Sequence, residues 1–403
     1  MTKKKKIKVL RIINRFNLGG PTYNAAYLTK YLSDDFETLL VGGEKYEEEE
    51  SSEFILEKLG LKPIIIPEMQ RSINRKNDRI AYKKIKDIIK EFQPDIVHTH
   101  ASKAGTLGRL AASKMKVPVI VHTFHGHVFH SYFGKAKTTF YKNIERYLAK
   151  KSSKIIAISD IQKNELGLEH KICKLDKIEV VQLGFDLSRF QEDIDEKRIS
   201  FRNEYQVSED EVAIGIIGRL VSIKNHKMFI DVVANVLAST TKKVRFFIVG
   251  DGEEKEAIKS YCSNSNIGFT EWNGHKKIVP VTFTSWIKNI DWLNAGLDIV
   301  VLTSLNEGTP VSLIEAQASN KPIVTTNVGG VKNITLENKT AYISEVNDIN
   351  DFTQKLSCLI ESENDRIKMG QKGWGFVKEK FSYERLTKDI EILYRDLLQL
   401  TKK

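Results

Sequence analysis

Short apolar runs alternate along this chain with longer segments in which apolar residues recur at helical spacing. Buried strands of a parallel sheet read as nearly continuous apolar runs, and a helix usually connects two of them. In the first half, the runs predict strands at 9–13, 38–41, 64–66, 96–98, 119–122 and 154–158, and the helical patterns predict helices at 24–32, 80–92, 104–113, 140–150 and 161–166. This alternation indicates an α/β fold.

The alternation restarts in the second half of the chain. Residues 213–218 form a new apolar run, and the pattern continues to about residue 372. The intervening residues 187–210 are polar and charged, which predicts a linker. A chain of 403 residues exceeds what a single core usually holds. We therefore expect two α/β domains, at 1–186 and 187–372, and a C-terminal helical segment at 373–403.

Two glutamates stand eight residues apart in the run Glu307-Gly-Thr-Pro-Val-Ser-Leu-Ile-Glu315. An apolar strand precedes them, so Glu307 is expected on the strand-to-helix loop and Glu315 within the helix. Each carboxylate can accept hydroxyl protons, one from a sugar ring and the other from a ribose. The spacing therefore predicts a clamp for a nucleotide sugar. The alternative is that the two acids merely complement the dipole at a helix start.

The predicted helix start itself favours an anion. Pro310 sits where a first helical turn tolerates a missing N–H. The amides of Gly308, Thr309 and Val311 then point out of the helix as free donors at its positive end. A diphosphate is the ligand that this arrangement suits.

Two cations follow the strand at 213–218, namely Arg219 and Lys224. Cations at a helix N-terminus oppose the helix dipole, so their presence there indicates that an anion binds. A nucleoside diphosphate gains negative charge as the glycosidic bond breaks, and both side chains could stabilise it without a metal ion. Surface charges at a helix start are the alternative.

Together these motifs resemble the retaining glycosyltransferases of family 4, whose GT-B architecture has two Rossmann-like domains with parallel sheets facing across a central cleft. The resemblance covers nearly the whole chain. Its motifs occur in the order of the family: Asn17-Leu-Gly19-Gly20-Pro21, His125-Gly126, Gly184-Phe-Asp186, Gly218-Arg219-Leu with Lys224, Val249-Gly250-Asp251-Gly252, the paired glutamates, and Gly329-Gly330-Val331.

Three positions depart from the pattern of the family. Pro21-Thr22 stands where many members have Ala-Glu, Leu183 replaces the Asn before the junction glycine, and Lys332-Asn333 replaces a common Pro-Glu. None of these changes removes a cation of the diphosphate site or a glutamate of the clamp. They bear on the identity of the sugar and the acceptor.

The resemblance implies roles for particular residues. It gives the N-terminal domain the acceptor and the C-terminal domain the nucleotide sugar, and it implies that the last helix crosses back to the first domain. It places His125 against the donor sugar near the reacting centre. The implied catalytic residues are His125, Arg219, Lys224 and Glu307. The implied donor-binding residues are Gly19, Gly20, Gly218, Arg219, Lys224, Gly250, Gly252, Glu307, Gly308, Thr309, Pro310, Val311 and Glu315.

Six of the nine histidines lie between His98 and His130, which raises the question of a metal site. No cysteine or carboxylate is interleaved with them, and zinc sites need converging ligands. We expect neither a metal nor another cofactor. Ligands of an open parallel sheet bind beyond the carboxyl ends of its strands, so His100 and His125 should face the interdomain cleft. The residues predicted to bind the acceptor are His100, Lys103, His127 and Phe129.

The net charge of +11 indicates an anionic partner. Nucleic acid is not expected, because no zinc-finger spacing, RNP-like strand or helix-turn-helix pattern occurs. Basic residues are dense at 71–90 and 135–154. The helix predicted at 140–150 places Phe140, Ile144, Tyr147 and Leu148 on one face and Lys142, Arg146 and Lys150 on another. This is the pattern of a peripheral contact with an anionic membrane. The alternative is a solvated helix whose apolar face packs in the core.

No apolar run is long enough to span a membrane, and the three cysteines show no disulfide or zinc spacing. A cytoplasmic enzyme at the inner face of the membrane is expected. It would move a hexosyl group from a nucleoside-diphosphate sugar, with UDP favoured, to a hydroxyl of a glycan or lipid-linked acceptor. Retention is implied by the resemblance alone. A GT-B sugar-nucleotide epimerase and a nucleotide-sugar-binding protein without turnover are the alternatives.

Overall fold

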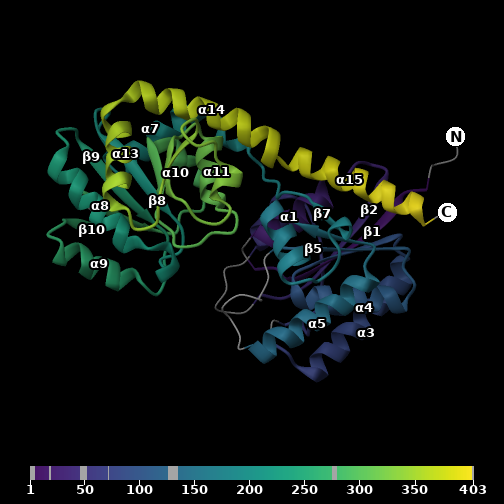
Figure 1. Ribbon diagram of the computed structural model, residues 1–403. Coiled ribbons are helices and arrows are strands. Elements are labelled where there is room, and N and C mark those ends of the chain that lie inside the picture. The colour runs from purple at the N-terminus through teal and green to yellow at the C-terminus, as the bar shows by residue number, and fades with distance from the viewer. Residues whose placement is uncertain are drawn as a thin grey trace. The chain divides into compact units, whose positions relative to one another are not determined.

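The computed structural model describes residues 5–17, 20–45, 52–70, 72–125, 135–274 and 279–401 (Figure 1). The chain divides into two compact units. Unit 1 consists of Met1–Phe185 and Phe381–Lys403, and unit 2 consists of Asp186–Lys380. The first strand and the last helix of the chain therefore belong to the same unit.

Unit 1 is built on a parallel sheet of seven strands in the order β3-β2-β1-β4-β5-β6-β7. Its strands are β1 (Ile7–Arg15), β2 (Phe36–Gly43), β3 (Ile64–Ile65), β4 (Ile96–His100), β5 (Val119–Phe124), β6 (Lys154–Ala157) and β7 (Ile178–Val180). Its helices are α1 (Gly20–Lys30), α2 (Glu53–Lys58), α3 (Arg75–Phe92), α4 (Ser102–Lys114), α5 (Lys135–Lys151), α6 (Asp160–Asn164) and α15 (Tyr383–Leu400).

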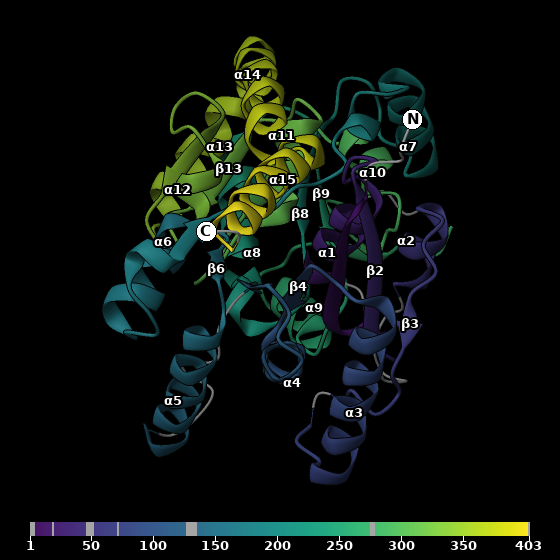
Figure 2. The same cartoon turned by 90° about the vertical axis from the view of Figure 1, so that its right-hand side faces the viewer.

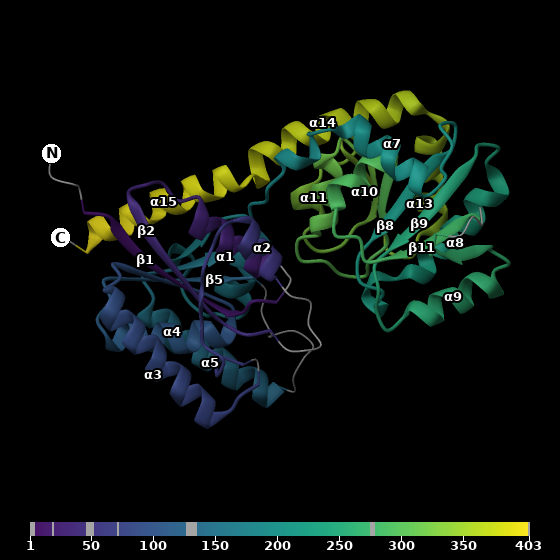
Figure 3. The same ribbon diagram turned by 180° about the vertical axis from the view of Figure 1, so that it is seen from behind.

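Helices cover both faces of this sheet (Figure 1, Figure 3). Side chains alternate between the two faces along each strand, so neighbouring residues of β1 have different surroundings. Val9 packs in one cluster with Leu386 of α15. Leu10 packs in another cluster with Ile85 of α3 and Ala111 of α4. The C-terminal helix is thus an integral layer of unit 1.

Unit 2 repeats the architecture, with seven parallel strands in the order β10-β11-β9-β8-β12-β13-β14. Its strands are β8 (Val212–Ile217), β9 (Val244–Val249), β10 (Phe269–Glu271), β11 (Val281–Ser285), β12 (Ile299–Leu302), β13 (Ile323–Thr326) and β14 (Ala341–Ser344). Its helices are α7 (Ile194–Glu204), α8 (His226–Ser239), α9 (Lys255–Asn264), α10 (Ile290–Gly296), α11 (Val311–Ala318), α12 (Val331–Ile334), α13 (Ile349–Glu361) and α14 (Glu363–Phe381).

A large apolar cluster of unit 2 lies between the sheet and its covering helices. Ile214 of β8 and Phe246 of β9 pack in it with Phe229 of α8 and with Phe352 and Leu356 of α13. Helix α13 runs beside β13 in Figure 2.

The two sheets confirm the predicted α/β fold with two Rossmann-like domains. In each, the strand order reverses next to the first strand, between β1 and β4 in unit 1 and between β8 and β12 in unit 2. Such reversal points are where open parallel sheets bind ligands, beyond the carboxyl ends of the strands. The loops that follow these strands are therefore the expected ligand-binding loops.

The predicted linker at 187–210 was wrong. Helix α7 forms 11 of its 24 residues, and Phe201 is fully buried. The segment is rich in charged residues, but its arginines have partners within the fold. Arg198 and Arg202 both bind the carboxylate of Asp298. Helix α14 also runs through residue 372 without a break, so the segment expected from residue 373 begins inside a helix.

Candidate active site

An ion pair joins the two loops that follow β8 and β12. Lys224 ends a 3₁₀ turn, Ser222–Lys224, and its Nζ lies 2.5 Å from Oε1 of Glu307. The hydroxyl of Ser304 donates to the same oxygen at 2.6 Å. The Lys224 and Glu307 side chains are only 20% and 11% exposed. Such partly desolvated, charge-assisted contacts are stronger than exposed ones, so the cation and the carboxylate predicted for the donor site form one unit.

Backbone contacts hold the two loops in register. The buried hydroxyl of Thr303 lies 3.1 Å from each of the carbonyl oxygens of Lys224 and Asn225. The amide of Leu305 donates to the carbonyl of Ile223 at 2.8 Å. The supporting roles of Thr303 and Ser304 were not predicted from the sequence. The available signal was two hydroxyl side chains directly after an apolar strand.

The loop that carries Glu307 rests on a glycine turn after β13. Gly329 has a φ of +46°, and a Cβ atom there would overlap the carbonyl oxygen of Glu307. A Cβ on Gly330 would overlap the carbonyl oxygen of Gly308, and the Gly330 amide donates to Glu307 O at 3.1 Å. The turn can therefore approach the backbone of the Glu307 loop this closely only because Gly329 and Gly330 have no side chains.

Gly308 differs from these two glycines. A Cβ atom there would meet no heavy atom within 4 Å, and its backbone does not require glycine. Next to it, helix α11 begins at Val311 after Pro310. The amides of Gly308, Thr309 and Val311 have no hydrogen-bond partner among the residues described. Free amides at a helix start suit an anion.

Three other predicted glycines hold the loops together by packing. The amide of Gly250 donates to Ser285 O at 3.0 Å, and that of Gly252 donates to Asp251 Oδ1 at 2.8 Å. The amide of Gly218 is likewise bonded, to a β9 carbonyl at 3.0 Å. A Cβ atom on Gly250 would overlap the carbonyl oxygen of Gly218. Close packing of the loops after β8 and β9 is thus a sufficient reason for glycine at Gly250, and donor binding by these residues stays a prediction.

Arg219, the second predicted cation, is far more exposed than Lys224. Its side chain is 69% exposed and lies 3.8 Å from Glu253, which is 68% exposed. Exposed pairs of this kind contribute little to stability. Arg219 is therefore free to reorient toward a ligand.

Glu315, the second predicted glutamate, lies in the second turn of α11. Burial raises the pKa of its carboxyl to about 7, while the charge of Arg189 opposes that shift. Arg189 in turn lies 3.7 Å from Asp291. The side-chain carboxyl of Glu315 makes no hydrogen bond or ion pair within the described residues, so it is available to hydroxyl donors.

In unit 1 the structure brings two predicted histidines together. Strand β4 runs through His100 and β5 through Phe124, both further than predicted, so His100 ends a strand and does not follow it. His100 Nδ1 lies 2.9 Å from His125 Nε2. His98 is fully buried, and its ring stacks on that of His100 with 4.2 Å between centroids.

The remaining residues predicted in unit 1 have different surroundings. Lys103 Nζ pairs with Asp78 Oδ1 at 2.5 Å and also donates to Ser72 O, which ties α4 to the start of α3. Gly20 begins α1, and a Cβ atom there would meet nothing within 4 Å. Three predicted residues lie outside the described part of the chain: Gly19, His127 and Phe129.

Among the described residues, no group of three His, Cys, Asp or Glu side chains could hold a metal ion. Histidines His127 and His130 lie outside that part of the chain. None of the described helices is long and apolar enough to cross a bilayer.

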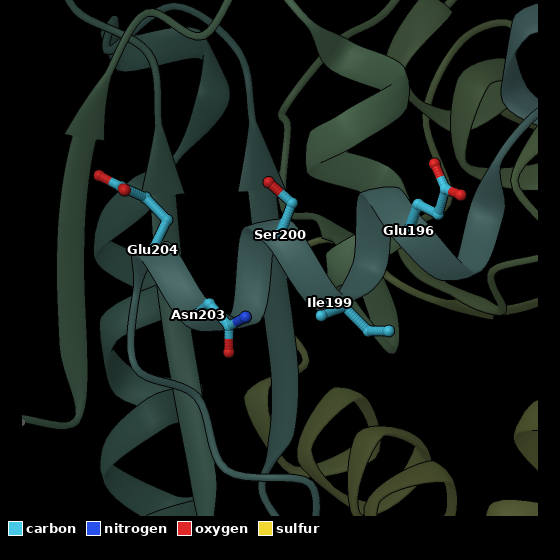
Figure 4. A pocket seen from close by; sticks show the side chains of 5 residues that line it. All are labelled: Glu196, Ile199, Ser200, Asn203 and Glu204. Carbon is cyan, nitrogen blue, oxygen red and sulfur yellow. The ribbon is translucent and has the colours of Figure 1, made fainter.

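A recess of about 630 Å³ lies elsewhere in unit 2 (Figure 4). Its lining comes from helix α7 alone and contains none of the predicted site residues: Glu196, Ile199, Ser200, Asn203 and Glu204. The recess therefore does not extend the site around Lys224.

Two family models match the chain. The one described as Glycosyltransferase Family 4 matches residues 18–189, and the one described as Glycosyl transferases group 1 matches residues 197–374. A relative from Escherichia coli, named UDP-Gal:alpha-D-GlcNAc-diphosphoundecaprenol alpha-1,3-galactosyltransferase, is 29% identical over 76% of each chain. The capsular polysaccharide biosynthesis glycosyltransferase CapM of Staphylococcus aureus is 25% identical over 82% of this chain and 86% of its own.

Solved structures share the fold. HepE of Anabaena in complex with UDP superposes with a TM-score of 0.79 at 16% identity, covering 97% of this chain and all of that one. A glycosyltransferase of Rickettsia africae superposes with a TM-score of 0.78 at 21% identity, covering 98% and 99%. Fold and matches together define a glycosyltransferase of the GT-B type. Within that class, the chain belongs to the family 4-like glycosyltransferases.

Proposed function

We propose that this glycosyltransferase moves a hexosyl group from a nucleoside-diphosphate sugar, with UDP as the favoured nucleotide, to a hydroxyl of a glycan or lipid-linked acceptor, with retention of configuration. One observation carries the proposal: Lys224 and Glu307 pair beside the three unpartnered amides of α11. Free amides and a cation suit a diphosphate, and a carboxylate suits the hydroxyls of the sugar attached to it.

The donor would lie along this loop. The amides of Gly308, Thr309 and Val311, together with Lys224 and Arg219, would bind the diphosphate and stabilise its charge as the glycosidic bond breaks. Glu307 would accept hydroxyls of the transferred sugar. Glu315, deeper in α11, would accept the ribose hydroxyls. The residue of unit 1 proposed to act on the transferred sugar is His125.

Retention can arise by two routes. Double displacement needs a carboxylate nucleophile close to the anomeric carbon, and the sequence around His125 offers none. We therefore favour front-face substitution, in which the departing phosphate accepts the proton of the acceptor hydroxyl. The bond to the diphosphate breaks and the bond to the acceptor oxygen forms on the same face of the sugar.

Relatives support the nucleotide and the acceptor class. The E. coli relative is named for UDP-galactose as its donor and for a diphosphoundecaprenol-linked GlcNAc as its acceptor. HepE has been solved with UDP-glucose. A UDP-hexose donor and a lipid-linked glycan acceptor are the corresponding proposals for this chain.

Incubation with UDP-glucose, UDP-galactose and UDP-GlcNAc, with and without a short-chain GlcNAc-diphospholipid, tests the proposal. We expect release of UDP and an α-linked product by NMR from at least one α-linked donor. An isomerised nucleotide sugar without UDP would indicate an epimerase. Binding by thermal shift without any turnover would indicate a binding protein.

Helix α5 supports a peripheral contact with an anionic membrane on the cytoplasmic side. Of the four residues predicted to share an apolar face, Leu148 is fully buried, whereas Phe140 and Tyr147 are 59% and 53% exposed. Only part of the face therefore packs in the core. Lys151 lies over the Tyr147 ring at 4.9 Å, and Lys150 is exposed. Exposed aromatic and basic side chains on one helix suit lipid headgroups.

Co-sedimentation with vesicles tests this contact. We expect binding to vesicles that contain phosphatidylglycerol, little binding to pure phosphatidylcholine, and release by salt because the attraction is electrostatic. Replacing Phe140 and Tyr147 by serine should abolish binding. Ile367→Ser on α14, at a residue that is 49% exposed, is the matched control. Equal binding by the double variant would rule the contact out.

A further inference from the structure

A buried arginine fixes the arrangement of one histidine beneath the predicted site of unit 1. Arg11 of β1 is fully buried and contacts four uncharged groups: Thr29 Oγ1 at 3.2 Å, Leu28 O at 3.1 Å, Tyr394 OH at 3.1 Å and His98 Nδ1 at 3.0 Å. A guanidinium can only donate. His98 Nδ1 must therefore be the acceptor and carry no proton.

The remaining contacts of His98 then follow. Its Nε2 carries the ring proton and donates to Thr123 Oγ1 at 2.7 Å. Tyr394 OH accepts from Arg11, so its own proton points to His98 Nδ1 at 2.6 Å. His98 is thus a neutral ring held on three sides. Its neighbours come from β1, β5 and the C-terminal helix α15.

The fixed ring supports the next histidine of the strand. His98 and His100 are two residues apart in β4, so their side chains lie on the same face of the sheet. Their rings stack with 4.2 Å between centroids and 29° between planes. His100 stacks in turn with His125 at 5.2 Å and 26°. Ala101, directly after His100, has a φ of +64° and a ψ of 166°, a conformation that a residue with a side chain rarely adopts.

The hydrogen bond between His100 and His125 contains a single proton. Burial lowers the pKa of His125 to about 4 and that of His100 well below its usual value, with the charge of Arg11 adding to the effect on His100. Both rings are therefore neutral at pH 7. The contact between His100 Nδ1 and His125 Nε2 then links the tautomers of the two rings, because one of these nitrogens must donate a hydrogen and the other must accept it. Within the described residues, only His100 Nε2 and His125 Nδ1 of these two rings lack a hydrogen-bond partner.

We propose that His100 is a positioning residue, whose Nδ1 fixes the ring orientation and the tautomer of His125, and which is itself held by His98 and Arg11 from behind. This inference rests on the proposed function insofar as His125 acts on the donor sugar. It replaces direct contact of His100 with an acceptor, because the His100 side chain is fully buried.

Two amide replacements of His100 separate positioning from packing. The amide of His100→Asn reaches the place of Nδ1, whereas the longer side chain of His100→Gln reaches that of Nε2. The measurement is ¹⁵N NMR of the histidine rings in the full-length, ligand-free protein, with the His125 signals assigned by His125→Gln. We expect one tautomer of His125 in the wild type and in His100→Asn, and an averaged mixture in His100→Gln.

A control and a kinetic measurement complete the test. His122→Asn removes an equally buried histidine, which contacts Thr99 Oγ1 at 2.9 Å, and should leave the His125 signals unchanged. Loss of one hydrogen bond should lower kcat for UDP release about tenfold in His100→Gln, with little change in KM, and His100→Asn should recover most of it.

Failure of the proposed function and failure of the positioning role of His100 would give different results. If the wild type turns over no nucleotide sugar, the proposed function fails, whereas the NMR comparison still decides the role of His100. Identical His125 signals in His100→Asn and His100→Gln would overturn the positioning role, whatever the activity. So would equal disturbance of those signals by His122→Asn.

Discussion

Lys224 and Glu307 neutralise each other in the ligand-free protein, with 2.5 Å between Nζ and Oε1. They come from loops 83 residues apart in the sequence. The donor therefore does not meet a bare cation and a bare carboxylate. It meets a pair whose two members can turn, one to the diphosphate and the other to the sugar.

Removing the cation of this pair should impair chemistry more than binding. We expect Lys224→Ala to lower kcat for UDP release about a hundredfold, as for loss of one charge-stabilising donor. Lys255→Ala is the matched control, because Lys255 is 19% exposed and also lies within 4 Å of carboxylates, yet belongs to α9. Thermal melting should show that both variants fold. Full activity of Lys224→Ala would exclude its role at the leaving group.

A side chain at Gly308 should affect the binding of the donor but not the stability of the protein. A methyl group there contacts nothing in the protein, so Gly308→Ala should change the free energy of unfolding by less than about 0.5 kcal/mol. Donor affinity should fall about tenfold if the diphosphate approaches this backbone. Gly330→Ala should instead destabilise the protein, because its methyl group overlaps Gly308 O. Gly375→Ala, also in open space but inside helix α14, should leave donor affinity unchanged and raise the free energy of unfolding by about 1 kcal/mol, because alanine favours a helix. Unchanged donor affinity in Gly308→Ala would contradict the proposed pose.

The buried carboxyl of Glu315 should make stability depend on pH. Its pKa is raised from about 4.5 to about 7 in the folded protein, so the folded state binds more protons than the unfolded state between these values. The free energy of unfolding should therefore fall as pH rises from about 4.5 to above 7. Glu315→Gln should be as stable as the wild type at pH 4.5 and more stable at pH 8, by on the order of 1–3 kcal/mol. Denaturant titrations at the two pH values measure the difference.

The two glutamates should differ in their effect on the bare nucleotide. Glu315→Gln should weaken binding of UDP by about 1–3 kcal/mol, because a ribose hydroxyl loses its charged acceptor. Glu307→Gln should impair transfer and leave UDP binding nearly intact. Calorimetric titration of UDP into both variants distinguishes the roles. Equal losses would show that the clamp is wrongly assigned.

Turnover should not need a divalent ion. The chain has one Asp-x-Asp triplet, Asp193-Ile-Asp195, which stands at the start of α7. Cations and free amides already surround the proposed diphosphate site, so UDP release should continue in EDTA. Complete inhibition by the chelator, reversed by a single divalent ion, would show that a metal takes part after all.

Much of the fold was predictable because parallel strands buried on both faces are continuous apolar runs. The run at 213–218 overlaps β8, and the apolar strand expected before Glu307 corresponds to β12. The two loops after them carry Lys224 and Glu307. Loop residues beyond buried strands are recognisable in a sequence because charge follows directly on an apolar run. Placement at the carboxyl ends of the strands then follows from parallel topology.

Other features could not be predicted because they depend on partners distant in sequence. Arg11 looks like an ordinary surface arginine until Tyr394 is known to lie beside it. The segment 187–210 looks like a linker until Asp298 is seen to bind Arg198 and Arg202. In both cases the acceptors of a buried arginine, Arg11 or Arg202, come from residues distant in sequence, so the packed structure around it could not be predicted.

The contact between Arg11 and Tyr394 also has a consequence for synthesis on the ribosome. The two residues are 383 positions apart, and α15 leaves the ribosome after every element of unit 2. Unit 2 consists of one continuous segment that ends before Tyr394. Because domains generally fold as they emerge, the second unit can be complete while the first still lacks a layer over its sheet. The order of completion is then the reverse of the order of the sequence, and a nascent chain stalled before Tyr383 should hold a finished unit 2 and an unfinished unit 1.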